Sequence, residues 1–279
     1  MTATQQGDAP EREYVLGTGE DELVRLGFQH RVWQSRTAAL WERAGLAPGM
    51  TVLDVGAGPG YATLDLAHFV GPKGRVIAVD ESERFTARLR EWVAPAAPAP
   101  VEVIRADVHD IDLPESSIDG AYARWVLCFV RDPKRVIERI ARALKPGAVF
   151  MVQDYFNYQM MALAPRSEAF ERLIPAIRAS WAAMGGDADV MGRVPTMCVE
   201  LGLEIRDIRC HARIARPGDL LWQWPETFFA NFIPRLVQHG HLSQEDAEAF
   251  AADWKRRRED PGTFFSVPPV YEAIVAKPR

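Results

Sequence analysis

Three carboxylates lie in or directly after short apolar runs in the first half of the chain: Asp54, Asp80 and Asp107. The run that contains Asp54 enters a glycine-rich turn, Gly56-Ala-Gly-Pro-Gly60, and residues 61–70 then carry apolar side chains at helical spacing. Glycines in such a turn permit positive φ and let a ligand lie against bare backbone. This order of strand, turn and helix is typical of the opening of a nucleotide-type α/β fold.

Two classes of ligand use such an opening. The dinucleotide fingerprint G-x-G-x-x-G needs its third glycine for close packing of helix on strand, and here that position holds Tyr61. A carboxylate at Asp54 would repel a pyrophosphate but could attract a cationic amino-acid ammonium, directly or through water. Asp80 follows the turn by about twenty residues, the offset expected of a carboxylate that accepts the ribose hydroxyls. The fit to the dinucleotide fingerprint is therefore poor.

A simpler explanation is that these carboxylates cap the helices that follow them, a role for which Asp is well suited. This explanation is adequate for any one of the three. We do not favour it for all three together with the glycine turn.

These residues resemble the class I S-adenosylmethionine-dependent methyltransferases, and in particular the small-molecule branch related to the ubiquinone/menaquinone-biosynthesis methyltransferases. The resemblance covers residues 48–155 well and the rest of the chain loosely. It implies S-adenosyl-L-methionine as the cofactor, with Asp107 beside the adenine amino group. The implied cofactor-binding residues are Tyr14, Gln34, Asp54, Gly56, Gly58, Pro59, Gly60, Asp80, Glu81, Asp107, Val108 and Arg124.

The elements that must position these residues alternate along the chain. Apolar runs at 52–55, 74–80, 101–105, 117–124 and 148–152 are separated by helical patterns. This alternation predicts a parallel sheet with right-handed crossovers, with the ligand beyond the carboxyl ends of the strands. Two later strands are expected at 203–214 and 263–276. The resemblance implies an α/β, Rossmann-like, doubly wound sheet of seven strands whose last strand is antiparallel.

The remaining segments are expected to cover the sheet and its ligand. Residues 1–46 are interpreted as an N-terminal helical lid and residues 47–279 as a methyltransferase domain, with helical substrate-cap insertions at about 156–183 and 219–258. Aromatic side chains are dense near and within these insertions. They form either a core or the wall of a ligand cavity, which is usually apolar and aromatic. The candidate substrate residues are Trp125, Tyr155, Trp222, Trp224, Phe228 and Phe229.

The implied reaction is direct displacement of an activated sulfonium methyl by a small, rather apolar acceptor, with O-methylation slightly preferred. Such a reaction depends mainly on holding the nucleophile in line with the methyl group. A general base is needed only if the acceptor must lose a proton. The sequence therefore identifies no firm catalytic residue. Asp154, Tyr155 and His30 are weak candidates, each with a structural role as the competing explanation.

The composition excludes several other classes. The net charge of −5 argues against nucleic acid as the main partner. Three cysteines without C-x-x-C spacing predict neither a metal site nor a disulfide framework, which fits a reducing cytoplasm. The polar start and the lack of a long apolar run predict no signal peptide and no membrane span. Two alternatives stay open: a nicotinamide-dependent oxidoreductase, and a non-catalytic cofactor-binding protein on the same fold. The sequence leaves the oligomeric state open.

Overall fold

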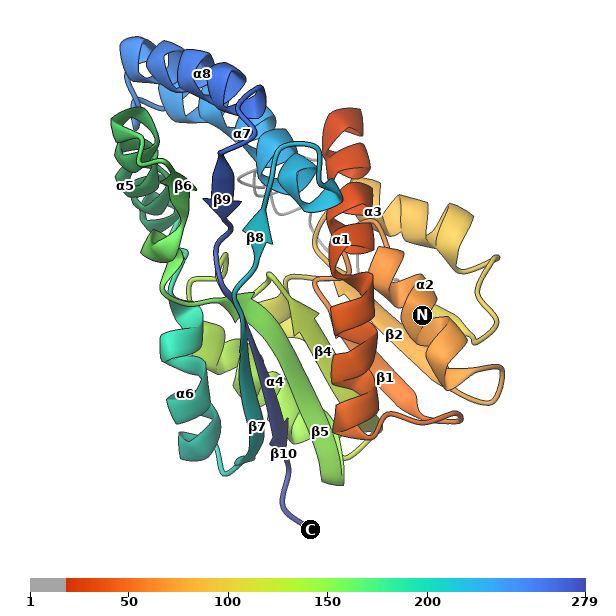
Figure 1. Ribbon diagram of the computed structural model, residues 1–279. Helices are drawn as coiled ribbons and strands as arrows, with labels where there is room; N and C mark the ends of the chain where they lie inside the picture. The colour runs from red at the N-terminus through yellow and green to blue at the C-terminus, as the bar shows by residue number, and fades with distance from the viewer. Residues whose placement is uncertain (1–18) are drawn as a thin grey trace, which may run out of the picture.

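The computed structural model describes residues 19–279, and its main feature is a seven-stranded mixed sheet flanked by helices (Figure 1). The strand order is β3-β2-β1-β4-β5-β10-β7. The first five strands pair in parallel, whereas β10 runs antiparallel to both β5 and β7. The predicted doubly wound sheet with an antiparallel last strand is thus confirmed. The strands are β1 (Thr51–Val55), β2 (Arg75–Asp80), β3 (Val101–Arg105), β4 (Ile118–Arg124), β5 (Leu144–Tyr155), β7 (Glu204–His211) and β10 (Val270–Ala276).

Helices cover both faces of this sheet. On one face α1 (Glu20–Ala44) and α2 (Tyr61–Val70) share an apolar cluster with the central strands. On the other face lie α4 (Pro133–Ala143) and α6 (Val194–Glu200). Helix α3 (Glu83–Arg88) follows β2 and continues into a π-helical turn, Leu89–Val93. Helices α3 and α4 have side-chain N-caps, since Ser82 accepts from the backbone N–H of Phe85, and Asp132 accepts from that of Arg135.

A buried polar network fixes the C-terminal half of α1 to the sheet. The hydroxyl groups of Thr37 and Tyr122 both donate to Oε1 of Gln153, at 2.9 and 2.6 Å. The amide of Gln153 donates to Glu272 at 2.8 Å, and Glu272 is also paired with Arg43. Because each of these polar groups is satisfied, the network can be buried without the cost of an unpaired group.

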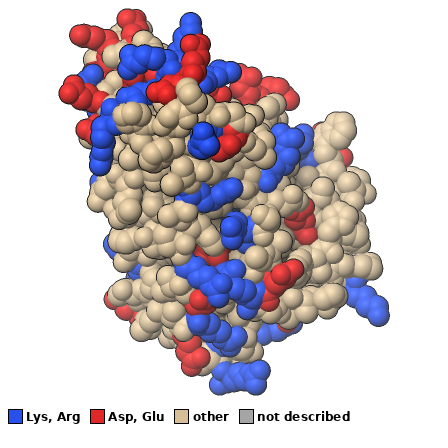
Figure 2. Space-filling model, viewed as in Figure 1, with Lys and Arg blue, Asp and Glu red and all other residues tan. Residues whose placement is uncertain are grey.

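A second layer stands over the carboxyl ends of the parallel strands (Figure 1). It contains the helices α5 (Glu168–Ala183), α7 (Leu220–Gln238) and α8 (Gln244–Arg258) and a three-stranded sheet in the order β6-β9-β8. The strands of that small sheet are β6 (Ala162–Ala164), β8 (Ile214–Ala215) and β9 (Phe264–Ser266). Charges of both signs gather over α8 on the face shown in Figure 2. Its first turn is acidic and its last turn basic, which suits the helix dipole.

The small sheet was not expected from the sequence, and it corrects two predicted strands. The run 263–276 is not one strand, because β9 pairs with β6 and β8 while β10 belongs to the main sheet. Pro268 and Pro269 separate the two, and proline has no N–H to donate to a sheet. Phe265 anchors β9 instead, fully buried against Phe170 and Trp254. Likewise the run 203–214 ends as a main-sheet strand at His211.

Candidate active site

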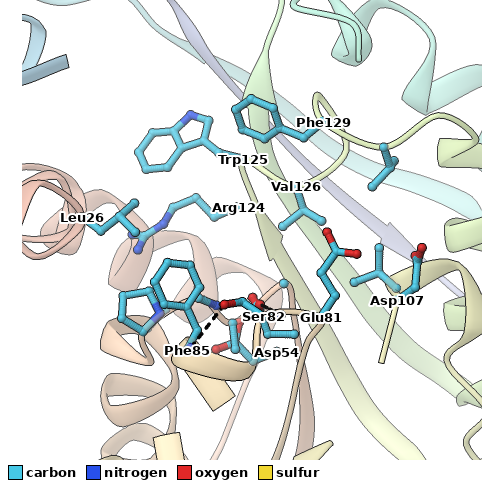
Figure 3. A pocket seen from close by; sticks show the side chains of 18 of the residues that line it. Leu26, Asp54, Glu81, Ser82, Phe85, Asp107, Arg124, Trp125, Val126 and Phe129 are labelled. Atoms are coloured by element: carbon cyan, nitrogen blue, oxygen red, sulfur yellow. Dashed lines mark hydrogen bonds between the residues drawn. The ribbon is translucent and has the colours of Figure 1, made fainter. Parts of the chain in front are cut away.

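A pocket of about 400 Å³ opens at the carboxyl ends of the central strands (Figure 3). It lies where the strand order reverses between β1 and β4, the point at which ligands bind in doubly wound sheets. Ten of its lining residues were predicted as ligand contacts: Asp54, Gly56, Gly58, Pro59, Asp80, Glu81, Asp107, Val108, Arg124 and Trp125. The tertiary structure therefore brings most of the predicted cofactor residues into one cavity.

The glycine turn forms part of the pocket wall. Gly58 has a φ of 55°, and a Cβ atom built on it would meet no atom within 4 Å, so bare backbone faces open space. Gly56 has a φ of 62°, and its Cβ would lie 2.6 Å from a side-chain methyl of Val126. Both positions thus require glycine, and the turn at Gly58 leaves room for a ligand against the backbone. Gly60 does not line the pocket, because it caps the start of α2.

The carboxylate of Asp80 ties the glycine turn to the start of α3. Its Oδ2 accepts from the N–H of Gly58 at 2.8 Å, and its Oδ1 accepts from the N–H of Ser82 at 2.9 Å. Asp80 is therefore held in place by backbone donors at the edge of the pocket.

Asp107 both caps the short helical turn that follows it and lines the pocket. Its Oδ1 accepts from the backbone N–H of His109 at 2.9 Å and from Nδ1 of the His109 ring at 2.6 Å. The other ring nitrogen, Nε2, accepts from the N–H of Asp132 at 3.3 Å. Because Nε2 is an acceptor, the proton of a neutral His109 ring lies on Nδ1 and points to Asp107. Helix capping, the simpler explanation, thus applies to Asp107, but it does not remove this side chain from the pocket.

Asp54 is the most deeply buried carboxylate of the pocket. It is 2% exposed, and its Oδ2 accepts from the hydroxyl of Thr63 at 2.6 Å. Burial raises the pKa of Asp54 to about 6, although the Thr63 hydrogen bond and the Arg124 cation act in the opposite direction. A buried carboxylate of this kind is a favourable partner for a ligand cation, since ion pairing would offset the cost of burying its charge.

Arg124, at the end of β4, connects the sheet with the two helices α1 and α2. Its guanidinium donates to the hydroxyl of Thr37 at 3.1 Å and to Nδ1 of His30 at 3.0 Å. Nε2 of His30 in turn contacts Asp65 at 3.0 Å. Burial lowers the pKa of His30, which is consistent with a neutral ring whose proton lies on Nε2. Gln34 also donates to Asp65, at 2.8 Å. His30 and Gln34 thus join helix to helix and do not line the pocket.

Other predicted residues lie outside the pocket. The buried Asp154 accepts from the N–H groups of Cys128 and Tyr155, at 3.1 and 2.9 Å, and burial raises its pKa to about 6. These contacts are structural, as the competing explanation proposed. Trp222 is absent from the lining of the main pocket and stacks on Trp254, with the ring centres 4.5 Å apart. Tyr14 lies outside the described residues.

Four predicted substrate residues surround a second, much smaller cavity of about 20 Å³: Tyr155, Trp224, Phe228 and Phe229. It lies between α1, α7 and the end of β5. Gln29 lines both cavities, and its Oε1 accepts from the indole N–H of Trp224 at 2.9 Å. The aromatic residues of the insertion are therefore neighbours of the main pocket but do not form its wall.

The side of the pocket opposite the carboxylates contains residues that sequence patterns did not identify. Leu26 and Gln29 come from α1, Phe129 from the segment after β4, and Ala183 and Met184 from the end of α5. These residues carry no local signal, because their positions depend on how distant segments fold over the sheet. Within residues 19–279, no group of three His, Cys, Asp or Glu side chains is arranged to hold a metal ion, and no helix is long and apolar enough to cross a bilayer.

Known proteins resemble this chain in sequence or in fold. A ubiquinone/menaquinone-biosynthesis C-methyltransferase of Shewanella sediminis is 30% identical over 140 residues, covering 50% of this chain and 54% of that protein. A Bacillus halodurans protein assigned to the methyltransferases superposes with a TM-score of 0.61 at 18% identity, covering 88% of this chain and all of that one. A Haemonchus contortus phosphoethanolamine N-methyltransferase 2, solved with S-adenosyl-L-methionine, has a TM-score of 0.52 at 19% identity, covering 88% and 53% of the two chains.

The two structural likenesses establish the fold alone, and the match to the Shewanella enzyme spans about half the length of that relative. Residues 53–152 match a family described as a methyltransferase domain. That region contains the glycine turn and the carboxylates at the ends of β1, β2 and β3. The predicted resemblance is confirmed, because residues 53–152 of this chain match the methyltransferase domain family.

Proposed function

We propose that this protein is an S-adenosylmethionine-dependent methyltransferase that methylates a small, rather apolar molecule. One observation carries the proposal. A single pocket has four carboxylates and bare glycine backbone on one side and mainly apolar side chains on the other. Figure 3 shows Asp54, Ser82 and Phe85 on the first side, with Trp125 and Phe129 across from them.

The carboxylate side of the pocket fits the cofactor group by group. Asp54 is buried and could pair with the ammonium of the methionine part. Asp80 lines the pocket and is proposed to accept the ribose hydroxyls, with Glu81 beside it. Asp107 and Val108 line the region proposed for the adenine. When bound, the cofactor supplies an activated methyl group, so the protein needs chiefly to orient the acceptor and exclude water.

The apolar side of the pocket suits the acceptor. We propose that α1 acts as the lid, since Leu26 and Gln29 reach the pocket from it, and that α5, α7 and α8 form the substrate cap. None of the weak catalytic candidates lines the main pocket, and His109 is engaged at both ring nitrogens. Methyl transfer thus proceeds by direct displacement and depends on positioning. O-methylation is retained as the finer proposal, although the relative from Shewanella sediminis is named as a C-methyltransferase.

The nicotinamide alternative fits this pocket less well. Tyr61, at the position where a dinucleotide site needs its third glycine, donates its hydroxyl to the carbonyl of Leu23 in α1 at 3.0 Å. A Cβ atom on Gly27 of α1 would lie 2.7 Å from that hydroxyl oxygen. The tyrosine therefore serves the packing of α1 on α2, at a position where a dinucleotide site has a glycine.

Calorimetric binding tests this proposal. S-adenosyl-L-methionine should bind the purified protein and NADH should not. Asp80→Ala should weaken cofactor binding about 10- to 150-fold, since one hydrogen bond to a charged group contributes about 1.5–3 kcal/mol. Asp112→Ala, which removes an exposed carboxylate from a surface ion pair, is the matched control and should bind normally.

Asp80→Ala also removes two bonds to backbone N–H groups, so thermal melting of each variant must show that the fold persists. Binding of NADH in place of the sulfonium cofactor would contradict the proposal. Cofactor binding without turnover of any candidate acceptor would instead support the non-catalytic alternative.

A further inference from the structure

The segment that follows β4 brings several residues to the pocket. It turns at Trp125, which has a φ of 52° in the left-handed region, and the N–H of Trp125 donates to the carbonyl of Gln153 at 2.9 Å. Bulky residues rarely adopt this conformation, and where they do it is most often at functional sites. Beyond the turn, Phe129, Val130 and Arg131 all line the pocket. The chain after β4 therefore forms one wall of the pocket.

The loop after α5 packs against this segment. The N–H of Asp187 donates to the carbonyl of Cys128 at 2.8 Å, and a Cβ atom on Gly186 would lie 2.5 Å from that carbonyl oxygen. Gly185 lies against the side chain of Arg131, since a Cβ atom there would lie 2.5 Å from Cγ and 3.2 Å from Nε of the arginine. Gly185 has a φ of 83°, in the region that favours glycine. The bare backbone of this loop thus makes room for the stem of Arg131.

The charge of Arg131 is not neutralised by any residue that the structure describes. Two of the described arginines line the pocket, and the other one, Arg124, donates to Thr37 and His30. Arg131 is exposed, and among residues 19–279 its guanidinium forms no ion pair and donates no hydrogen bond. The four carboxylates of the same pocket would attract this cation if it could reach them. The guanidinium therefore lies beyond reach of the carboxylate side and is available to a ligand.

A single uncommitted cation beside an apolar surface favours an apolar ligand with one anionic group. The neighbouring side chains of the pocket wall, Phe129, Val130, Ala183 and Met184, are apolar. The planar guanidinium fork matches a carboxylate, which carries one negative charge. A phosphate ester group carries a charge of about −1.5 to −2 at neutral pH. It would leave negative charge unbalanced in a pocket that already has four carboxylates. The arrangement thus favours a monocarboxylate.

We propose that the methyl acceptor is a small apolar molecule with one carboxylate, and that Arg131 binds this carboxylate at the open edge of the pocket. This inference rests on the proposed function and deepens it, because it assigns the class of acceptor and one residue that selects it. The ion pair anchors the acid end, and the apolar body lies along Phe129 and Met184 toward the cofactor. Arg131 is thus a specificity-determining residue.

Equilibrium dialysis with three probes tests the inference, in the presence of S-adenosylhomocysteine so that no turnover occurs. Hydrocinnamate carries one carboxylate, hydrocinnamamide has the same shape without the charge, and phenethyl phosphate carries a phosphate. The wild-type protein should bind hydrocinnamate most tightly. Arg131→Gln removes the cation, and it should weaken hydrocinnamate binding about three- to tenfold while changing hydrocinnamamide binding less than about twofold. The effect is modest because an exposed ion pair is partly screened.

Arg206→Gln is the matched control. Arg206, in β7, is also exposed and forms no ion pair within residues 19–279, but it lies outside the pocket lining. This variant should bind all three probes as the wild type does, and thermal melting of both variants checks that the fold persists. Equal hydrocinnamate binding by Arg131→Gln and wild type would overturn the inference. A wild type that does not prefer hydrocinnamate over the other two probes, or that binds none of them, would do the same.

Calorimetry with S-adenosylhomocysteine separates this inference from the proposed function. Arg131→Gln should bind it as tightly as the wild type does, because the arginine faces the acceptor. A tenfold loss of this affinity would place Arg131 on the cofactor and overturn the inference. Failure of the wild type to bind S-adenosylhomocysteine would defeat the proposed function, whereas normal binding without preference for the carboxylate probe defeats this inference alone.

Discussion

Protonation of Asp54 should control the affinity for the cofactor. Burial raises its pKa to about 6, so the carboxyl of the ligand-free protein titrates close to neutral pH. A bound ammonium would favour the ionised form and lower this pKa. Below pH 6, cofactor binding must therefore displace a proton, and the affinity should fall as the pH falls.

The size of the effect follows from the pKa. At pH 8 almost every Asp54 carboxyl is ionised, whereas at pH 5 about one in eleven is ionised. The dissociation constant of S-adenosylhomocysteine should therefore rise about elevenfold between pH 8 and pH 5, or about 1.4 kcal/mol. Thr63→Val removes the hydrogen bond that lowers the pKa of Asp54, so the pH at which affinity begins to fall should move upward.

Isothermal titration calorimetry at pH 5, 6, 7 and 8 measures this dependence. In two buffers of different ionisation enthalpy, it also counts the protons released on binding. Asp54→Asn should bind more weakly at pH 8 and lose most of the dependence on pH. Asp154→Asn, which alters a second buried carboxyl with a pKa of about 6 outside the pocket, should keep it. The reasoning is refuted if wild-type affinity is constant from pH 8 to pH 5, or if Asp54→Asn retains the same slope.

Two further substitutions test the elements that hold the pocket. Gly60→Ala should lower the free energy of unfolding by about 1–3 kcal/mol or more in urea denaturation, because Gly60 has a φ of 89° and a Cβ there would lie 2.4 Å from a methyl carbon of Leu89. Gly240→Ala, at a φ of 73° with no atom within 4 Å, should cost less, and equal losses would contradict the steric argument. Thr37→Val should cost about 1–3 kcal/mol by the same assay, since it removes a buried hydroxyl bonded to Gln153. Thr37→Ser should restore most of this loss, and a Ser variant as unstable as Val would refute the role of the hydroxyl.

The sequence determined the half of the site that local patterns encode. The first three strands are short, mainly apolar runs, the glycine turn follows the first of them, and Asp54, Asp80 and Asp107 stand in or just after them. Because parallel strands present their carboxyl ends at one edge of a sheet, alternation of strand and helix was enough to place these side chains together. The antiparallel last strand followed from the family resemblance and is present as predicted.

Only the tertiary structure decided the other half. Gln34 was predicted to contact the cofactor, yet the fold gives it Asp65 as its partner. Trp222 was predicted to contact the substrate, yet it stacks on Trp254. Helical spacing identifies a buried face but not what covers that face, because the partner comes from a distant segment. The end of α5, which completes the pocket, lies beyond residue 152, where the methyltransferase domain match ends. The left-handed turn at Trp125 likewise depends on contacts from β5, α1 and α7, which no local pattern near that residue records.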